Sequence, residues 1–123
     1  MRFLTALLAV AALLAVPALA AGSDDSVTAA KNKKCDVPKT FPEDGGAFTS
    51  LTAGTGVKCT SAASVATAWA KCAAANGKGG RCVKKVKGYA CRETATTVGT
   101  TRTSKLTCQK KKLVVKFGAT RTV

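Results

Sequence analysis

The cysteines are the residues of this chain whose type and spacing bear most directly on chemistry. There are six of them, at positions Cys35, Cys59, Cys72, Cys82, Cys91 and Cys108. A thiolate zinc site is built from close pairs such as C-x-x-C, but the closest two cysteines here, Cys82 and Cys91, are nine positions apart. An even set of cysteines in an exported domain is typical of structural disulfides. We therefore predict a disulfide framework and no metal site, with a pairing that spacing alone leaves open.

The residue types needed for catalysis are scarce. The chain has no histidine, which excludes Ser–His and Cys–His nucleophile pairs, a histidine general base and histidine-ligated zinc. A glycosidase needs two carboxylates, and from Gly45 to the end of the chain Glu93 is the only acid. Ser61 and Ser64 are better explained by the start and surface of a helix than by a Ser–Lys pair. We predict no enzymatic activity and no cofactor.

Positive charge is the main compositional feature. Lys and Arg number 20 against 6 Asp and Glu, for a formal net charge of +14, and five of the six acids lie between Asp24 and Asp44. The charge therefore belongs to the later part of the chain. A polyanion bound to such a domain would release counterions, which gives affinity without sequence discrimination and a steep salt dependence. The alternative interpretation is that lysines solubilise the protein and protect exposed strands.

The start of the chain has the pattern of a secretory signal. Met1-Arg2 is positive, residues 3–16 are apolar except for Thr5, and Pro17 precedes a small-residue Ala-Leu-Ala site. An uncleaved anchor is the alternative, because the apolar run approaches the length needed to span a bilayer. We predict a signal peptide over residues 1–21, a flexible leader over residues 22–34, and a secreted, extracellular protein.

Hydrophobic periodicity predicts one helix followed by strands. Apolar residues at helical spacing lie between a cap at Thr60 or Ser61 and the stop signal Asn76-Gly77. Beyond the glycine loop at 77–80 the period changes to two, which indicates strands. The helical set is Ala62, Val65, Ala66, Trp69, Cys72 and Ala73, and the alternating sets are Tyr89 and Cys91, Leu106 and Cys108, and Leu113, Val115 and Phe117.

These elements predict an α+β fold: one helix packed on a three- to four-stranded antiparallel sheet and stapled by disulfides, the segment from Ala47 to Ala53 supplying the fourth strand. The single disulfide-stapled domain covers residues 35–118, and residues 119–123 are a tail. Cysteines of the helix would meet cysteines of the strands across the core. The favoured pairs are Cys59 with Cys108, Cys72 with Cys82, and Cys35 with Cys91.

The same alternation predicts a basic face. If the apolar strand residues face the helix, the opposite face of the sheet presents Arg92, Lys105, Thr107 and Lys116. Nearby turns add more lysines. The candidate anion-binding residues are Lys84, Lys85, Lys87, Arg92, Lys105, Lys110, Lys111, Lys112 and Lys116.

Several short motifs resemble a known module. They are Cys59-x-x-Ala62-x-x-Val65-Ala66, Gly88-Tyr89-x-Cys91, Thr107-Cys108 and Val115-Lys116-Phe117. Together they resemble a small secreted cysteine-containing module of actinobacterial exported proteins, over the stretch from Leu51 to Phe117. The resemblance implies a similar fold and carries no catalytic residue, because no activity is assigned to that module. The extra cysteines Cys72 and Cys82 and the high lysine content depart from its simpler pattern.

The function predicted from these observations is electrostatic and non-enzymatic. We expect a monomer that associates with anionic polymers at the cell envelope, either an envelope polymer or nucleic acid, without sequence preference. Trp69, Tyr89 and Phe117 fall on predicted core faces, so no platform for stacking bases is expected.

The alternative function is a secreted protein-binding effector such as a protease inhibitor, whose partner would be an extracellular protein. Arg81 and the lysines of residues 84–87 would suit a protease that cleaves after basic residues. A rigid, disulfide-stapled loop limits the entropy lost on binding.

Overall fold

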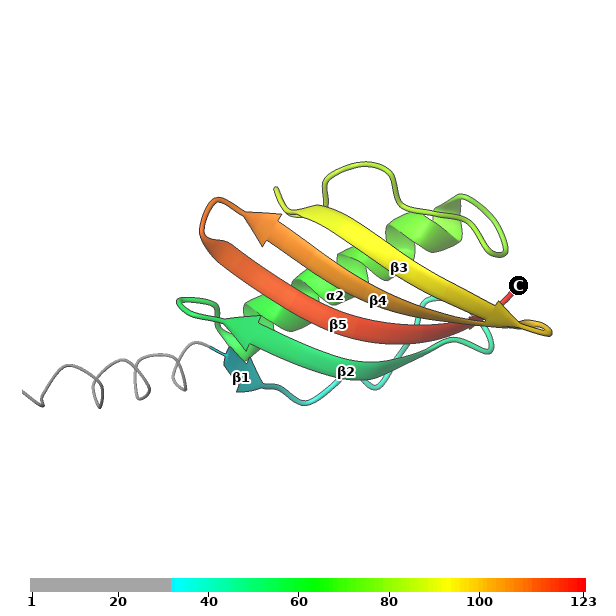
Figure 1. The fold of residues 1–123 in the computed structure, drawn as a ribbon, viewed down its shortest axis with the longest axis horizontal. Coiled ribbons are helices and arrows are strands. Elements are labelled where there is room, and N and C mark those ends of the chain that lie inside the picture. Colours follow the sequence, from blue (N-terminus) through cyan, green and yellow to red (C-terminus); the bar gives the residue numbers. More distant parts are fainter. Residues whose placement is uncertain (1–31) are drawn as a thin grey trace, which may run out of the picture.

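The computed structural model describes residues 32–123, which form one antiparallel sheet with a helix against one of its faces (Figure 1). The elements in chain order are β1 (Asn32–Lys34), β2 (Ala47–Gly54), α2 (Cys59–Ala75), β3 (Ala90–Val98), β4 (Thr101–Lys110) and β5 (Leu113–Thr122). The strands lie in the order β1-β2-β5-β4-β3. The predicted signal peptide, residues 1–21, and most of the predicted leader, residues 22–34, lie outside the described residues.

Helix α2 packs closely on the sheet because its inner surface is built largely from alanine. Ala62, Ala66, Ala70 and Ala73 have no exposed surface, and alanine is also the best helix former. Trp69 is the one large side chain on this surface, and its ring meets that of Phe117 edge-on with centroids 5.5 Å apart. The helix ends at Asn76, where the chain turns into the glycine-rich segment. In the described part of the chain no helix is long and apolar enough to cross a membrane.

Alternation, which is regular in β4 and runs from Val115 to Phe117 in β5, separates a core face from an open face. Leu106 and Cys108 of β4 are buried beneath the helix, as are Val115 and Phe117 of β5. The residues between them point the other way, and their side chains are exposed. Figure 1 views the sheet from this second face, with α2 behind it. The α+β fold with one helix, an antiparallel sheet and disulfides is therefore confirmed.

The sheet has five strands rather than three to four, because one stretch expected to be irregular adds a strand, and a second such stretch lengthens β5. Residues 32–34 of the predicted leader form β1, which pairs with β2. Residues 119–122 of the predicted tail continue β5 to Thr122. Arg121 is charged and lies near the end of the chain, where a charged residue suggests exposure. In the structure it is 1% exposed and is bonded to Glu43.

The three disulfides join Cys35 to Cys59, Cys72 to Cys82 and Cys91 to Cys108. The predicted Cys72–Cys82 pair is confirmed. The predictions of Cys59 with Cys108 and of Cys35 with Cys91 are wrong. Cys91 and Cys108 are direct partners in the β3–β4 register and lie on the helix side of the sheet, so they bond to each other. Cys35, at the end of β1, bonds instead to the first residue of α2.

Candidate anion-binding face

A row of alternating cations and hydroxyls crosses the open face of the sheet. The β-ladder registers pair Arg92 with Thr107, Thr107 with Lys116, Lys116 with Thr52, and Thr52 with Lys34. Directly paired residues lie on the same face of a sheet. The row therefore runs through all five strands, with a cation on β3, β5 and β1 and a threonine on β4 and β2. Strands are about 4.8 Å apart, so successive cations are anchored about 10 Å apart.

A second, shorter row lies beside the first. Lys105 pairs with Gly118, and Gly118 with Ser50. A hollow of about 230 Å³ lies between Lys105 and Ser50. Its lining is Ser50, Thr52, Lys105, Leu106, Thr107, Lys116 and Phe117. The hollow therefore joins the two rows and is lined by a lysine from each of the neighbouring strands β4 and β5.

The two glutamates of the described part, Glu43 and Glu93, lie on the opposite side of the sheet. Within residues 32–123 the two ion pairs are Glu93 with Arg102 and Glu43 with Arg121, and in both the side chains are largely buried. Ser104 also donates a hydrogen bond to Glu93, at 2.7 Å. Because both glutamates are held by arginines on the helix side, neither pairs with a lysine of the open face.

The structure divides the predicted anion-binding residues into three places. Arg92, Lys105 and Lys116 lie together on the open face. Lys110, Lys111 and Lys112 lie at the turn between β4 and β5, where Lys111 has a positive φ of 54°. Lys84, Lys85 and Lys87 lie against the helix, lining a hollow of about 400 Å³ with Lys71 and Ala68. All nine are exposed, but they do not form one surface.

Lys34 belongs to the open-face row and was missed from the sequence. It falls in the segment expected to be a flexible leader, and a strand of three residues has no periodicity to reveal it. The available signal was its position directly before Cys35. A cysteine tied to the helix by a disulfide also fixes the residues next to it, as the β1–β2 pairing shows.

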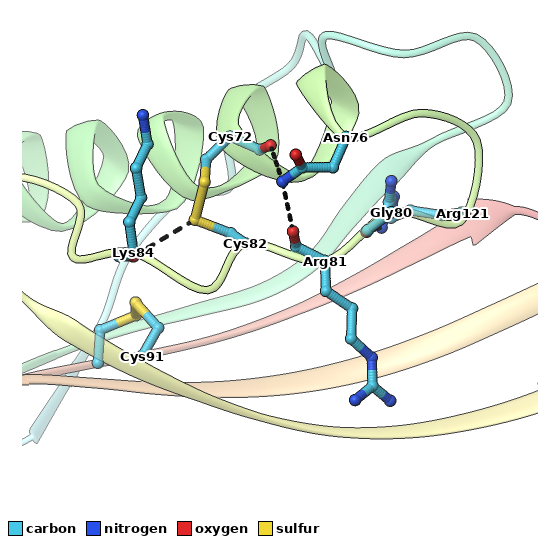
Figure 2. The surroundings of a disulfide bond; sticks show 9 residues. Cys72, Asn76, Gly80, Arg81, Cys82, Lys84, Cys91 and Arg121 are labelled. Atoms are coloured by element: carbon cyan, nitrogen blue, oxygen red, sulfur yellow. Dashed lines mark hydrogen bonds between the residues drawn. A yellow bond between two sulfur atoms is a disulfide. The ribbon is translucent and has the colours of Figure 1, made fainter.

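The segment that follows α2 is held rigidly at several points (Figure 2). The side-chain amide of Asn76 donates to the carbonyl oxygen of Arg81 at 2.6 Å and to that of Cys72 at 3.2 Å. Arg102 donates to the carbonyl of Gly79, and Arg121 to that of Gly80. The Cys72–Cys82 disulfide closes this stretch.

Directly after Cys82, Val83 is 92% exposed. Arg81, Lys84 and Lys85 around it are exposed as well. In Figure 2 the side chains of Arg81 and Lys84 leave the segment in opposite directions. The braced segment, residues 77–85, is therefore held from Gly79 to Cys82 and presents an apolar side chain among cations directly after the disulfide.

No protein-family model, curated protein or solved structure matches this chain. Across residues 32–123 there is also no cluster of three or more metal-ligating side chains. What the arrangement can do is therefore argued from its geometry and charge alone.

Proposed function

We propose that this protein is a non-enzymatic, secreted domain that binds anionic polymers at the cell envelope through the open face of its sheet. The observation that carries the proposal is the row of Arg92, Thr107, Lys116, Thr52 and Lys34 across all five strands. A linear polyanion lying across the strands would meet a cation about every 10 Å, with hydroxyl donors between them.

The composition of the face supports charge-based rather than base-specific binding. The aromatic side chains in the described part pack in or against the core: Phe41 contacts Phe48, and Phe117 contacts both Phe48 and Trp69, while Tyr89 is 7% exposed. None is placed to stack on a base from the open face, which single-strand binders require. Binding then rests on counterion release and should weaken steeply with salt.

The test compares two variants of equal net charge. The first is Arg92→Gln/Lys105→Gln/Lys116→Gln on the open face. The matched control is Lys39→Gln/Lys71→Gln/Lys78→Gln, which removes three exposed cations elsewhere. Oxidised proteins are bound to immobilised polyphosphate and to isolated cell walls, and the association constant is measured as salt is varied.

We expect the slope of log K against log [salt] to become less negative by about 2 to 3 for the open-face variant, because each lost contact removes roughly 0.7–0.9 from its magnitude. The control should keep nearly the slope of the unmodified protein. Equal losses in the two variants would show that net charge matters and the face does not. No retention at low salt would overturn the proposal.

A second candidate function, docking to a protease, is favoured by the braced segment. Three side chains and a disulfide hold its backbone, so little entropy would be lost when a partner binds. Exposed Val83 next to Lys84 and Lys85 presents a sequence that suits an enzyme specific for basic residues.

Inhibition of trypsin-like proteases in about 0.5 M salt tests this function, since surface ion contacts are mostly screened there. Inhibition that survives the salt and is lost in Lys84→Ala/Lys85→Ala would support it. Rapid cleavage within residues 81–85, or no inhibition, would exclude it.

A further inference from the structure

We infer that the hollow between Lys105 and Ser50 is a binding site for one tetrahedral oxyanion, a phosphate or sulfate ester group of the bound polymer. This inference rests on the proposed function and specifies the ligand chemistry of the same face. It distinguishes such polymers from those whose charge comes from carboxylates.

Gly118, the register partner of both Lys105 and Ser50, is required to be glycine by the packing around it. Gly118 does not have a positive φ, so backbone conformation does not explain the absence of a side chain. A Cβ at this position would collide with the hydroxyl of Thr49 and would lie 3.0 Å from that of Ser50. The hydroxyl groups of Thr49 and Ser50 thus fill the space above Gly118, and a larger residue would displace them.

An irregularity in β2 brings those hydroxyls together. The β2–β5 register shifts between Phe48 and Ser50, so Thr49 is an extra residue opposite β5. Bulges of this kind change the direction of a side chain and are frequent next to functional sites. Here the bulge lets Thr49 and Ser50, which are consecutive residues, both approach Gly118. An unbulged strand would point them to opposite faces.

The groups around the hollow match the needs of an oxyanion. Lys105 and Lys116 supply ammonium donors, and Ser50, Thr52 and Thr107 supply hydroxyls. No carboxylate lines the hollow, so no acceptor competes for these donors. Phosphate presents three strong acceptor oxygens, whereas a carboxylate presents two. Donors arranged on three strands around a depression suit the tetrahedral group.

The position of the hollow also fits a polymer rather than an isolated ion. It shares Thr52, Thr107 and Lys116 with the cation row. A chain that follows the row would therefore pass the hollow and could place one ester group in it, while its neighbouring charges meet Arg92 and Lys34.

The experiment is a titration of the isotopically labelled, oxidised protein with inorganic phosphate, inorganic sulfate, acetate and sodium chloride at matched ionic strength. Backbone amide chemical shifts are followed by NMR. We expect saturable shifts at Ser50, Lys105 and Gly118 with phosphate and sulfate, and small, non-saturating shifts with acetate and chloride. Comparison of the phosphate and sulfate titrations shows which of the two anions the hollow binds more tightly.

Two variants test the assigned groups. Lys105→Gln/Lys116→Gln should weaken phosphate binding about tenfold or more, since charge-assisted hydrogen bonds are lost. Ser50→Ala, which removes a hydroxyl without changing the charge, should weaken it about threefold. The control Lys71→Gln/Lys78→Gln should bind phosphate as the unmodified protein does. An unchanged fold in each variant is verified from its amide spectrum.

Failure of this inference is distinguishable from failure of the proposed function. If phosphate and chloride perturb Gly118 alike while polymer retention still depends on the open face, the oxyanion site is wrong and the polyanion function stands. If polyglutamate is retained as strongly as polyphosphate at equal charge density, the oxyanion preference is likewise overturned. If no polymer is retained, the proposed function fails as well.

Discussion

At the residue scale, Arg121 is the most constrained charged group in the described chain. Its Nε and Nη2 donate to the two carboxylate oxygens of Glu43 at 2.7 Å and 3.1 Å, and its Nη1 donates to the carbonyl of Gly80 at 2.6 Å. The guanidinium also lies 6.0 Å from the centre of the Trp69 ring. The planar fork of arginine satisfies all these partners at once, which the single ammonium of lysine cannot do.

Replacement of Arg121 by Met should therefore lower the free energy of unfolding by about 3 kcal/mol, because Glu43 and the Gly80 carbonyl lose their partner in a largely buried place. Arg121→Lys should recover less than half of this loss. Urea denaturation with the disulfides intact measures both. Lys116→Met, a similar change on the exposed face, should alter stability by no more than about 0.5 kcal/mol. Similar losses at the two positions would contradict the assignment.

At the element scale, the Cys91–Cys108 and Cys72–Cys82 disulfides constrain different parts of the fold. Cys91–Cys108 joins two strands that are already paired along their whole length. Cys72–Cys82 instead joins the helix to a segment without regular pairing, across a sequence separation of 10. Removing the first leaves a complete β-ladder, whereas removing the second leaves the braced segment attached by a few hydrogen bonds and no covalent cross-link.

We expect Cys72→Ser/Cys82→Ser to lower the free energy of unfolding by about 3 kcal/mol, as the chain-entropy relation gives for a loop of this size. The accompanying local effect is faster amide hydrogen exchange at residues 80–84, with β3 and β4 unaffected. Cys91→Ser/Cys108→Ser should show the opposite pattern, with the braced segment protected as before. Uniformly faster exchange in both variants would refute this division of roles.

At the scale of the whole molecule, like charges repel across the folded surface. The chain has a net charge of +14, and its buried ion pairs do not offset the exposed lysines. Compact states with high net charge are destabilised by self-repulsion, which salt screens. Raising sodium chloride from about 10 mM to about 200 mM should therefore raise the melting temperature by a few degrees.

The variant Lys39→Gln/Lys71→Gln/Lys78→Gln has a lower charge and should show a weaker salt effect. Differential scanning calorimetry provides both melting temperatures. A melting temperature that falls over the same salt range would mean that exposed attractive pairs outweigh the repulsion.

The sequence predicts the parts of this fold that follow from local periodicity. The helix around Trp69 and the alternation of β4 and β5 are found as expected. The hydrophobic period of each element can be recognised within that element, without knowledge of its neighbours. The Cys91–Cys108 pair had a signal that was missed: Gly99-Thr100 forms a two-residue turn, and counting outward from it places those cysteines opposite each other.

Other features depend on pairing between distant segments and could not be predicted locally. Lys34 joins the cation row through the register of β1 on β2. The hollow between Lys105 and Ser50 depends on β2 lying beside β5. The apolar pattern indicates which face of a strand is buried but does not specify its neighbours. The four open-face residues that were predicted, Arg92, Lys105, Thr107 and Lys116, lie on strands joined by tight turns, where register follows from the turn.

The strand order has a consequence for how the molecule is assembled. β5 lies between β2 and β4, although it is the latest of the five strands along the chain. As the chain emerges from its N-terminal end, β3 and β4 can form a hairpin with its own disulfide, but β2 has only the three residues of β1 beside it until β5 appears. The two halves of the sheet then close in one late, long-range step, and only this step completes the row of cations from Arg92 to Lys34. The proposed binding face is therefore coupled to completion of the fold, so a partly emerged chain does not yet present it.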